Sequence, residues 1–303
     1  MLRHVPAVLI GTLALAAIAC ADGLRRRTPV PPPTPSNDYT REQLEAIPAP
    51  ANERYYLIVF GSQSTPKLPR FTHTWATAIK ATWTEGQPEP TLELHTISWM
   101  PATLRIRTLN RHPEPGVNLE LYETIANMQA NSERIAMWGP FALRTAGYRR
   151  FLIQKDFMDS HAIGYQCVDN RGEAARCGNA CDCIHAITDM DPEFDRTRYP
   201  LRWYGEAGSR NIVEQVMRRN VVLDGGQTQD WLIPRLGLDC AGIVRRCYNG
   251  PVGDLDRPTI SPTVDPRVIP VAVAIVRGFQ FDNRRILIHL HPDEWNRTAH
   301  FEN

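Results

Sequence analysis

Three strand-like segments follow one another early in this chain, and they restrict the folds open to it more than any other feature. The run Tyr55-Tyr-Leu-Ile-Val-Phe60 is rich in aromatic and β-branched residues and ends at Gly61, which is the pattern of a buried strand. Segment 71–79 alternates large residues with small ones, and segment 92–100 also has a strand pattern. Because short connections join them, the three segments predict an antiparallel sheet or meander.

Helical patterns follow the strands. Apolar residues recur at helical spacing in three segments, which we expect to be helices: 118–130, 142–158 and 211–222. Segment 161–168 reads as a strand before a cysteine-rich loop, and 268–276 with 284–291 predicts a terminal hairpin. The mixture predicts one α+β domain in which an antiparallel sheet packs against helices.

Residues 1–20 have the layout of an export signal. Arg3 and His4 precede an apolar run from Val5 to Ala19, which is shorter than a membrane span requires. The end of this run, Ala17-Ile-Ala-Cys20, resembles the lipobox of bacterial lipoproteins, in which the cysteine is lipidated, and it also suits an ordinary signal peptidase. We expect an exported protein of the cell envelope or periplasm that is anchored to a membrane through Cys20.

Residues 21–54 predict a spacer between this anchor and the folded domain. Three arginines at 25–27 precede a segment of repeated prolines, which favours an extended polyproline conformation. The folded domain is expected to span 55–303, with an extension after about residue 199. A formal net charge of +1 gives no electrostatic argument for a nucleic-acid partner.

The cysteine count is informative for an exported protein. Six cysteines follow Cys20, and an even number in an oxidising compartment favours disulfides: Cys167, Cys177, Cys181, Cys183, Cys240 and Cys247. Cys167 and Cys177 flank a turn-rich loop whose ends can meet. Cys240 and Cys247 lie in a helical-looking segment, where a rise of about 1.5 Å per residue places them roughly 10 Å apart, beyond disulfide reach.

No metal or other cofactor is expected. The cluster from Cys167 to His185 has no Cys-x-x-Cys pair, so its spacing does not fit a common zinc site. His289 and His291 share one strand face and form a conceivable metal pair, but Pro292 and the charged residues after it indicate an exposed strand end.

Two short segments carry the residue types needed for a cysteine nucleophile. Cys183 opens an expected helix, where the helix dipole and a nearby imidazole lower the pKa of a thiol. Asp182 or Asn179 can cap that helix, and its first-turn N–H groups can stabilise an oxyanion. His73 lies on the strand 71–79 as a base, and His95 on the next strand can orient it. The alternatives are a disulfide role for the cysteine and core positions for the histidines.

The order His73, His95, Cys183 resembles the circularly permuted branch of the papain-like NlpC/P60 superfamily, which includes YiiX-like and lipoprotein N-acyltransferase-like domains. The segment Met137-Trp-Gly-Pro-Phe-Ala-Leu143 and Tyr165 are similar to the region that those domains place between the histidine and the cysteine. The resemblance covers about residues 55–191 and implies a papain-like fold.

One departure from that family lies next to the thiol. Permuted domains commonly have Asn-Cys at the helix start, whereas this chain has Asp182-Cys183. A carboxylate there opposes ionisation of the thiol unless it points away. Cys181, two residues earlier, is an alternative nucleophile.

A second segment offers the same chemistry elsewhere. Leu238-Asp-Cys-Ala-Gly242 resembles the cysteine motif of the unpermuted NlpC/P60 domains, which places the nucleophile at Cys240. That order requires a downstream histidine, and His289 or His291 can serve.

The leading hypothesis is a cell-envelope cysteine hydrolase or acyltransferase that acts on an amide or ester bond. Its substrate would be a peptidoglycan peptide or a lipoprotein, and Trp75, Trp99 and Trp138 are candidate pocket walls. The competing hypothesis is a non-catalytic, disulfide-stabilised envelope lipoprotein that binds a partner or a glycan.

Overall fold

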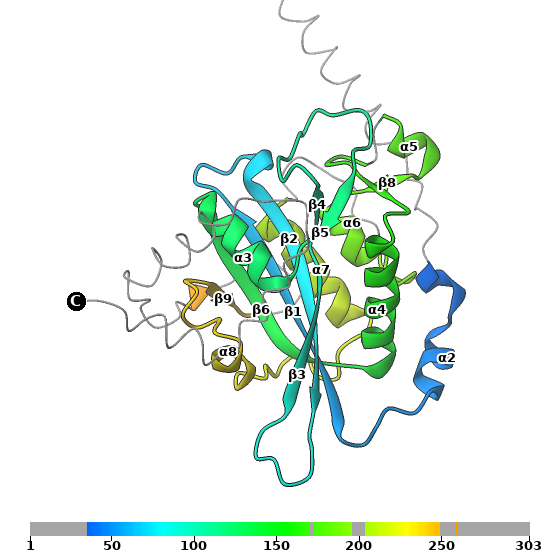
Figure 1. Ribbon diagram of the computed structural model, residues 1–303, viewed down its shortest axis with the longest axis vertical. Helices are drawn as coiled ribbons and strands as arrows, with labels where there is room; N and C mark the ends of the chain where they lie inside the picture. The colour runs from blue at the N-terminus through cyan, green and yellow to red at the C-terminus, as the bar shows by residue number, and fades with distance from the viewer. Residues whose placement is uncertain (1–34, 170–171, 196–203, 249–257, 260–303) are drawn as a thin grey trace, which may run out of the picture.

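The computed structural model describes residues 35–169, 172–195, 204–248 and 258–259. Its centre is a six-stranded sheet of order β10-β9-β6-β1-β2-β3 (Figure 1). The strands of this sheet are β1 (Glu53–Gln63), β2 (Thr72–Thr82), β3 (Thr91–Ile97), β6 (Arg134–Leu143), β9 (Val244–Arg246) and β10 (Pro258–Thr259). Neighbouring strands run antiparallel except for β6 and β9, which are parallel.

Two small sheets flank the central one. β4 (Trp99–Pro101) pairs antiparallel with β5 (Gly116–Asn118), and β7 (Gly164–Tyr165) pairs in parallel with β8 (Ala180–Cys181). β4 follows β3 after the single residue Ser98, so the strand expected over 92–100 is interrupted at that position.

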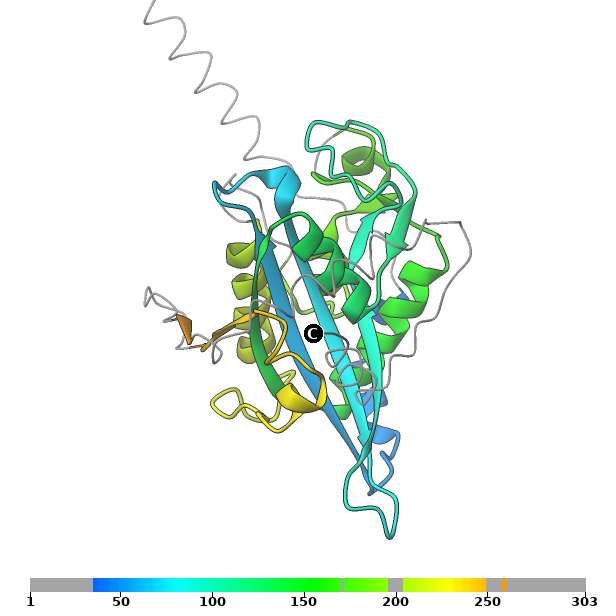
Figure 2. The same cartoon turned by 60° about the vertical axis from the view of Figure 1, so that its left-hand side comes forward.

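Helices cover both faces of the central sheet (Figures 1 and 2). One face, here called the α6 face, carries α4 (Thr145–Asp159), α6 (Cys183–Thr188) and α7 (Glu206–Arg218). The opposite face, the α3 face, carries α3 (Leu121–Ala130) and α8 (Leu232–Arg235). Side chains alternate between the two cores along each strand, and the middle of β1 is buried on both sides. This explains why its sequence is a continuous apolar run.

The predicted α+β class is confirmed. The strands expected at 55–60 and 71–79 are β1 and β2, and the three expected helices correspond to α3, α4 and α7. The signal segment with Cys20 and the terminal hairpin expected at 268–291 lie outside the described residues. Within the described ranges, no helix has the length and apolar character needed to cross a bilayer.

Sequence patterns did not reveal β6, which contains Gly139 and Pro140. The pairing of β1 with β6 shifts register between Leu57 and Val59, which marks a β-bulge. Gly139 adopts φ +97° there, and a Cβ at this position would lie 2.7 Å from the Leu57 carbonyl oxygen. The bulge accommodates a glycine and a proline that otherwise argue against a strand.

The N-terminal boundary of the folded part lies earlier than expected. A 3-10 helix, η1 (Pro35–Asp38), and α2 (Arg41–Ala46) precede β1, and both pack against α4. Thr40 and Gln43 form a capping box at the start of α2, and Arg149 of α4 donates to the carbonyls of Leu44 and Ile47. The predicted spacer over 21–54 is therefore wrong for its described part.

The extension expected after residue 199 also belongs to the domain where it is described. Ile212, Val213 and Val216 of α7 are completely buried in the core of the α6 face, and β9 extends the central sheet.

The docked α2 makes a prediction about stability. Leu44 is 3% exposed, so Leu44→Ala should lower the free energy of unfolding by about 2 kcal/mol, near the low end for a buried leucine. Ile47, 51% exposed just after α2, is the matched control, and Ile47→Ala should change it by less than about 0.5 kcal/mol. Denaturant unfolding of both variants measures the difference. Equal losses would mean that α2 does not contribute through Leu44.

Candidate active site

Cys183 is the first residue of α6, as the sequence predicts. Asp182 precedes it in an extended conformation, with φ −94° and ψ −179°, and its Oδ1 accepts from the backbone N–H groups of Ile184 and His185, both at 2.9 Å. The prediction that Asp182 caps this helix is confirmed. The cap fixes where α6 starts and hence where the thiol lies.

Asp182 also belongs to a buried charged group. Nδ1 of His185 lies 2.6 Å from Oδ2 of Asp169 and 3.5 Å from Oδ2 of Asp182, and all three side chains are buried. One atom from each lies within 4.8 Å of the others, a spacing that a metal ion could bridge. Asp182 caps α6 and both carboxylates contact His185, so we assign these three residues the role of fixing α6 to the loop after β7.

The Cys183 thiol lies near the part of β2 that β3 does not pair, because β3 pairs with β2 only from Ala76 onward. The backbone N–H of Thr74, in this buried part of the strand, acts to lower the pKa of the Cys183 thiol. Burial and then the Asp182 carboxylate raise the pKa of the Cys183 thiol well above its usual value, and they outweigh the stabilising N–H groups of Thr74 and Cys183 itself. The expected lowering of this pKa is therefore wrong, and the resting thiol is neutral.

His73, the residue before Thr74, is 1% exposed. Its ring stacks on Trp75 with 5.5 Å between ring centroids, and its Nε2 lies 2.8 Å from Oγ of Ser98. Its Nδ1 is buried and has no hydrogen-bond partner. Burial lowers the pKa of His73 to about 3, so the imidazole is neutral at physiological pH.

The structure brings His73 and Cys183 to the same point of β2 without a hydrogen bond between them. The His73 ring lies on the α3 face with Trp75, whereas Cys183 packs against the core of the α6 face. Thr74, whose backbone N–H acts on the pKa of the Cys183 thiol, is the residue after His73.

His95 does not take the third position that the sequence predicts. It pairs with Ala78, five residues along β2 from His73, which is roughly 16 Å. Its Nε2 contacts Glu93 at 3.0 Å, and its ring packs against Tyr148. Ser98 contacts His73 instead, because the break between β3 and β4 turns it toward the imidazole. The only sequence signal for Ser98 was its place on the adjoining strand.

The alternative nucleophiles lie in unsuitable surroundings. Cys240 is exposed in a turn between α8 and β9, where Gly242 has φ +66° and a strand follows, so the expected helix start is wrong. Its proposed partners His289 and His291 lie outside the described residues. Cys181 is 1% exposed within β8, with its side chain in the core.

The remaining expectations concern thiols and tryptophans. Cys167 and Cys177 are free thiols, so the loop-closing bridge between them is not formed in this structure. Trp99 and Trp138 are buried in the core of the α6 face and do not line an open pocket. Trp75 is also buried, and it contacts the imidazole of His73.

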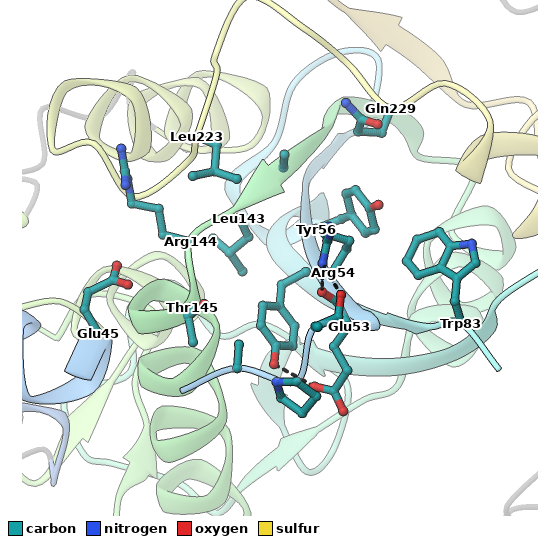
Figure 3. Close-up of a pocket in the computed structure, with 15 residues that line it drawn as sticks. Glu45, Glu53, Arg54, Tyr56, Trp83, Leu143, Arg144, Thr145, Leu223 and Gln229 are labelled. Carbon is teal, nitrogen blue, oxygen red and sulfur yellow. Dashed lines mark hydrogen bonds between the residues drawn. The ribbon is translucent and has the colours of Figure 1, made fainter. Parts of the chain in front are cut away.

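A groove of about 570 Å³ opens at the opposite end of β1 (Figure 3). Its walls combine charged, aromatic and aliphatic side chains: Glu45, Glu53, Arg54, Tyr56, Trp83, Arg144 and Leu223. Tyr56 precedes Ser62, the partner of His73, by six residues or roughly 20 Å, so the groove does not reach the thiol.

Comparison of this chain with protein-family models, curated proteins and solved structures found no match. The functional argument therefore rests on the geometry around Cys183 and His73.

The buried imidazole predicts a pH-dependent stability. His73 has a pKa of about 3 in the folded chain and about 6.5 when unfolded, so the unfolded state binds more protons between these values. The contribution of His73 to the free energy of unfolding is fully present above about pH 6.5 and falls as the pH drops. By pH 5 it should have lowered the free energy of unfolding by about 2 kcal/mol.

Denaturant unfolding at pH 7 and pH 5 tests this. His73→Gln should reduce the loss between the two pH values by about 2 kcal/mol, because glutamine has no proton to gain. His112→Gln is the control, since the His112 side chain is 79% exposed. An unchanged pH dependence in His73→Gln would contradict the assignment.

Proposed function

We propose that this protein is a cell-envelope cysteine hydrolase or acyltransferase that acts on an amide or ester bond, with Cys183 as nucleophile and His73 as base. One observation carries the proposal: His73 has a buried imidazole nitrogen without a partner, and the residue after it, Thr74, is close enough to Cys183 for its backbone N–H to act on the pKa of the thiol. A buried nitrogen without a hydrogen-bond partner lowers the stability of the fold, so its presence calls for an explanation, and a functional role is one.

Ser98 supplies the third polar group in place of His95. If Nε2 carries the proton of the neutral ring, it donates to Oγ of Ser98, and Nδ1 is left to accept the proton of the thiol. Ser98 is itself held, because Thr124 Oγ1 donates to its Oγ at 2.9 Å and its backbone N–H donates to Asn118 Oδ1 at 2.6 Å. The imidazole is thus positioned by a network rooted in α3 and β5.

The reaction begins from a neutral thiol and a neutral imidazole. Nδ1 of His73 takes the proton as the Cys183 sulfur attacks the carbonyl carbon, and the imidazolium then protonates the leaving amine or alcohol. Water or a second acceptor attacks the acyl-enzyme, and Cys183 leaves as a thiol. The proton therefore moves during attack, without a preformed thiolate.

Backbone N–H groups are available for the oxyanion. Asp182 occupies the N–H groups of Ile184 and His185, which leaves those of Cys183 and Thr74 next to the sulfur. One such donor contributes roughly 3 kcal/mol to stabilisation of the transition state. In this arrangement the capping carboxylate reduces the number of helix N–H groups that can serve.

The compartment and the substrate classes in this proposal come from the export signal and the family resemblance in the sequence. An exported, lipid-anchored enzyme with this chemistry would act on a peptidoglycan peptide or a lipoprotein at the membrane surface. In the competing function, a non-catalytic envelope lipoprotein, Cys183 and His73 would be core residues whose reactivities are independent of each other.

Acylation by a small activated thioester separates these two functions. Cys183 should form an acyl adduct, located by peptide mass spectrometry, and His73→Gln should slow it about a hundredfold, the usual contribution of a general base. Cys240 is the internal control, because its exposed thiol should acylate equally fast in both proteins. Equal rates at Cys183 with and without His73 would leave no basis for the enzyme.

The network behind His73 makes a graded prediction for turnover. Ser98→Ala should lower kcat roughly fivefold with little change in KM, because it removes one hydrogen bond of about 1 kcal/mol to His73. Thr124→Val should lower kcat less, because Thr124 reaches His73 only through Ser98. His95→Gln is the control, since His95 lies far from the site. A larger loss in His95→Gln than in Ser98→Ala would restore His95 as the third residue.

A further inference from the structure

The parallel pair β7–β8 aligns two cysteines. Gly164 pairs with Ala180 and Tyr165 pairs with Cys181, and the N–H of Gln166 donates to the Cys181 carbonyl at 3.1 Å. The extended backbone of Asp182 continues this alignment by one more residue. Cys167 and Cys183 each lie two residues beyond the pair Tyr165–Cys181, where one chain enters a turn and the other begins α6.

Their spacing suits a disulfide. Adjacent strands lie about 4.8 Å apart, and disulfides join residues whose Cα atoms are about 4.4–6.8 Å apart. Both side chains pack, partly buried, against the core of the α6 face, and both are free thiols. Cys167 also raises the pKa of the Cys183 thiol through their electrostatic interaction, which agrees with their being near each other.

We propose that Cys167 and Cys183 form a reversible disulfide, which makes this pair a redox modification site. The disulfide itself depends only on the two thiols and their alignment. Its consequence rests on the proposed function, because a disulfide at Cys183 would remove the nucleophile and switch off acyl transfer.

The oxidant is a small-molecule disulfide, as expected in a compartment outside the cytoplasm. One cysteine loses its proton and attacks this disulfide, which releases one thiol and leaves a mixed disulfide. The second cysteine loses its proton and attacks the mixed disulfide, which releases the second thiol. The two protein sulfurs are oxidised by two electrons in total, and the small disulfide is reduced to two thiols.

Cys177 is the competing partner, because it is exposed at the end of α5 (Ala174–Cys177). It follows Cys167 closely in sequence, and their pairing is the bridge expected from the sequence alone. The β7–β8 alignment favours Cys183 as the partner of Cys167, because it brings both residues to the same end of the two strands, where both side chains pack against the core of the α6 face.

The test equilibrates the full chain in buffers of oxidised and reduced glutathione, followed by acid trapping, alkylation of free thiols and peptide mass spectrometry. A peptide that joins Cys167 to Cys183 and is lighter by two hydrogens should appear in oxidising buffer and disappear on reduction. It should persist in Cys177→Ser and vanish in Cys167→Ser. Mapping the unmodified chain answers the question even if Cys167→Ser does not fold.

Three outcomes would overturn the proposal: a bridge between Cys167 and Cys177, glutathione on Cys183 without a bridge, or thiols that stay reduced throughout. Acylation of Cys183 is measured separately on the same samples. A disulfide without His73-dependent acylation would contradict the proposed enzyme function and support the redox site. His73-dependent acylation without the disulfide would support the enzyme function and contradict the redox site.

Discussion

Burial of β1 and β2 on both faces is the constraint on which this structure depends. The polar side chains in the middle of these strands lie in a core, where a polar group without a hydrogen-bond partner costs free energy. Ser62 donates to Glu133 at 2.6 Å, Thr74 pairs with Ser209 of α7, and Thr77 pairs with Thr96 of β3. His73 has such a partner at one nitrogen only. The same burial that stabilises the sheet leaves the other nitrogen beside the edge where Cys183 lies.

Asp182 shows how the stability of α6 opposes the reactivity of its first residue. Its carboxylate satisfies two N–H groups, and a cap of this kind contributes about 1 kcal/mol. The same charge raises the pKa of the neighbouring thiol, in addition to the larger effect of burial. Asparagine caps about as well as aspartate and carries no charge. Asp182 has in addition an oxygen 3.5 Å from Nδ1 of His185 in α6, and this contact helps to fix the helix. Its charge also opposes formation of the Cys183 thiolate.

Local sequence patterns predicted those helices and strands whose residues suit the burial and capping that they have in the fold. β1 and β2 were predicted because their composition and alternation match double-sided burial, and α6 because Asp182 caps it. β6 was missed because a bulge holds Gly139 and Pro140 in a strand. The prediction that His95 orients His73 was wrong for a different reason. The position at which β3 ends determines which residue contacts His73, and here it is Ser98. That end depends on the pairing of β4 with β5, which the sequence pattern does not show. The docking of α2 depends on Arg149, which lies far away in sequence.

The neutral resting state of Cys183 bears on both proposed reactions. Acyl transfer and disulfide formation both need the Cys183 proton to leave, and burial makes its spontaneous loss rare. In the proposed acyl transfer, His73 would receive the proton only when a carbonyl group is in place, because a thiolate alone is poorly solvated beside β2. In the proposed disulfide, Cys167 can attack first, but burial raises its pKa to about 12, so its thiol is also neutral at rest. Which of the two reactions occurs would then depend on whether a carbonyl substrate or an oxidising disulfide reaches Cys183 first.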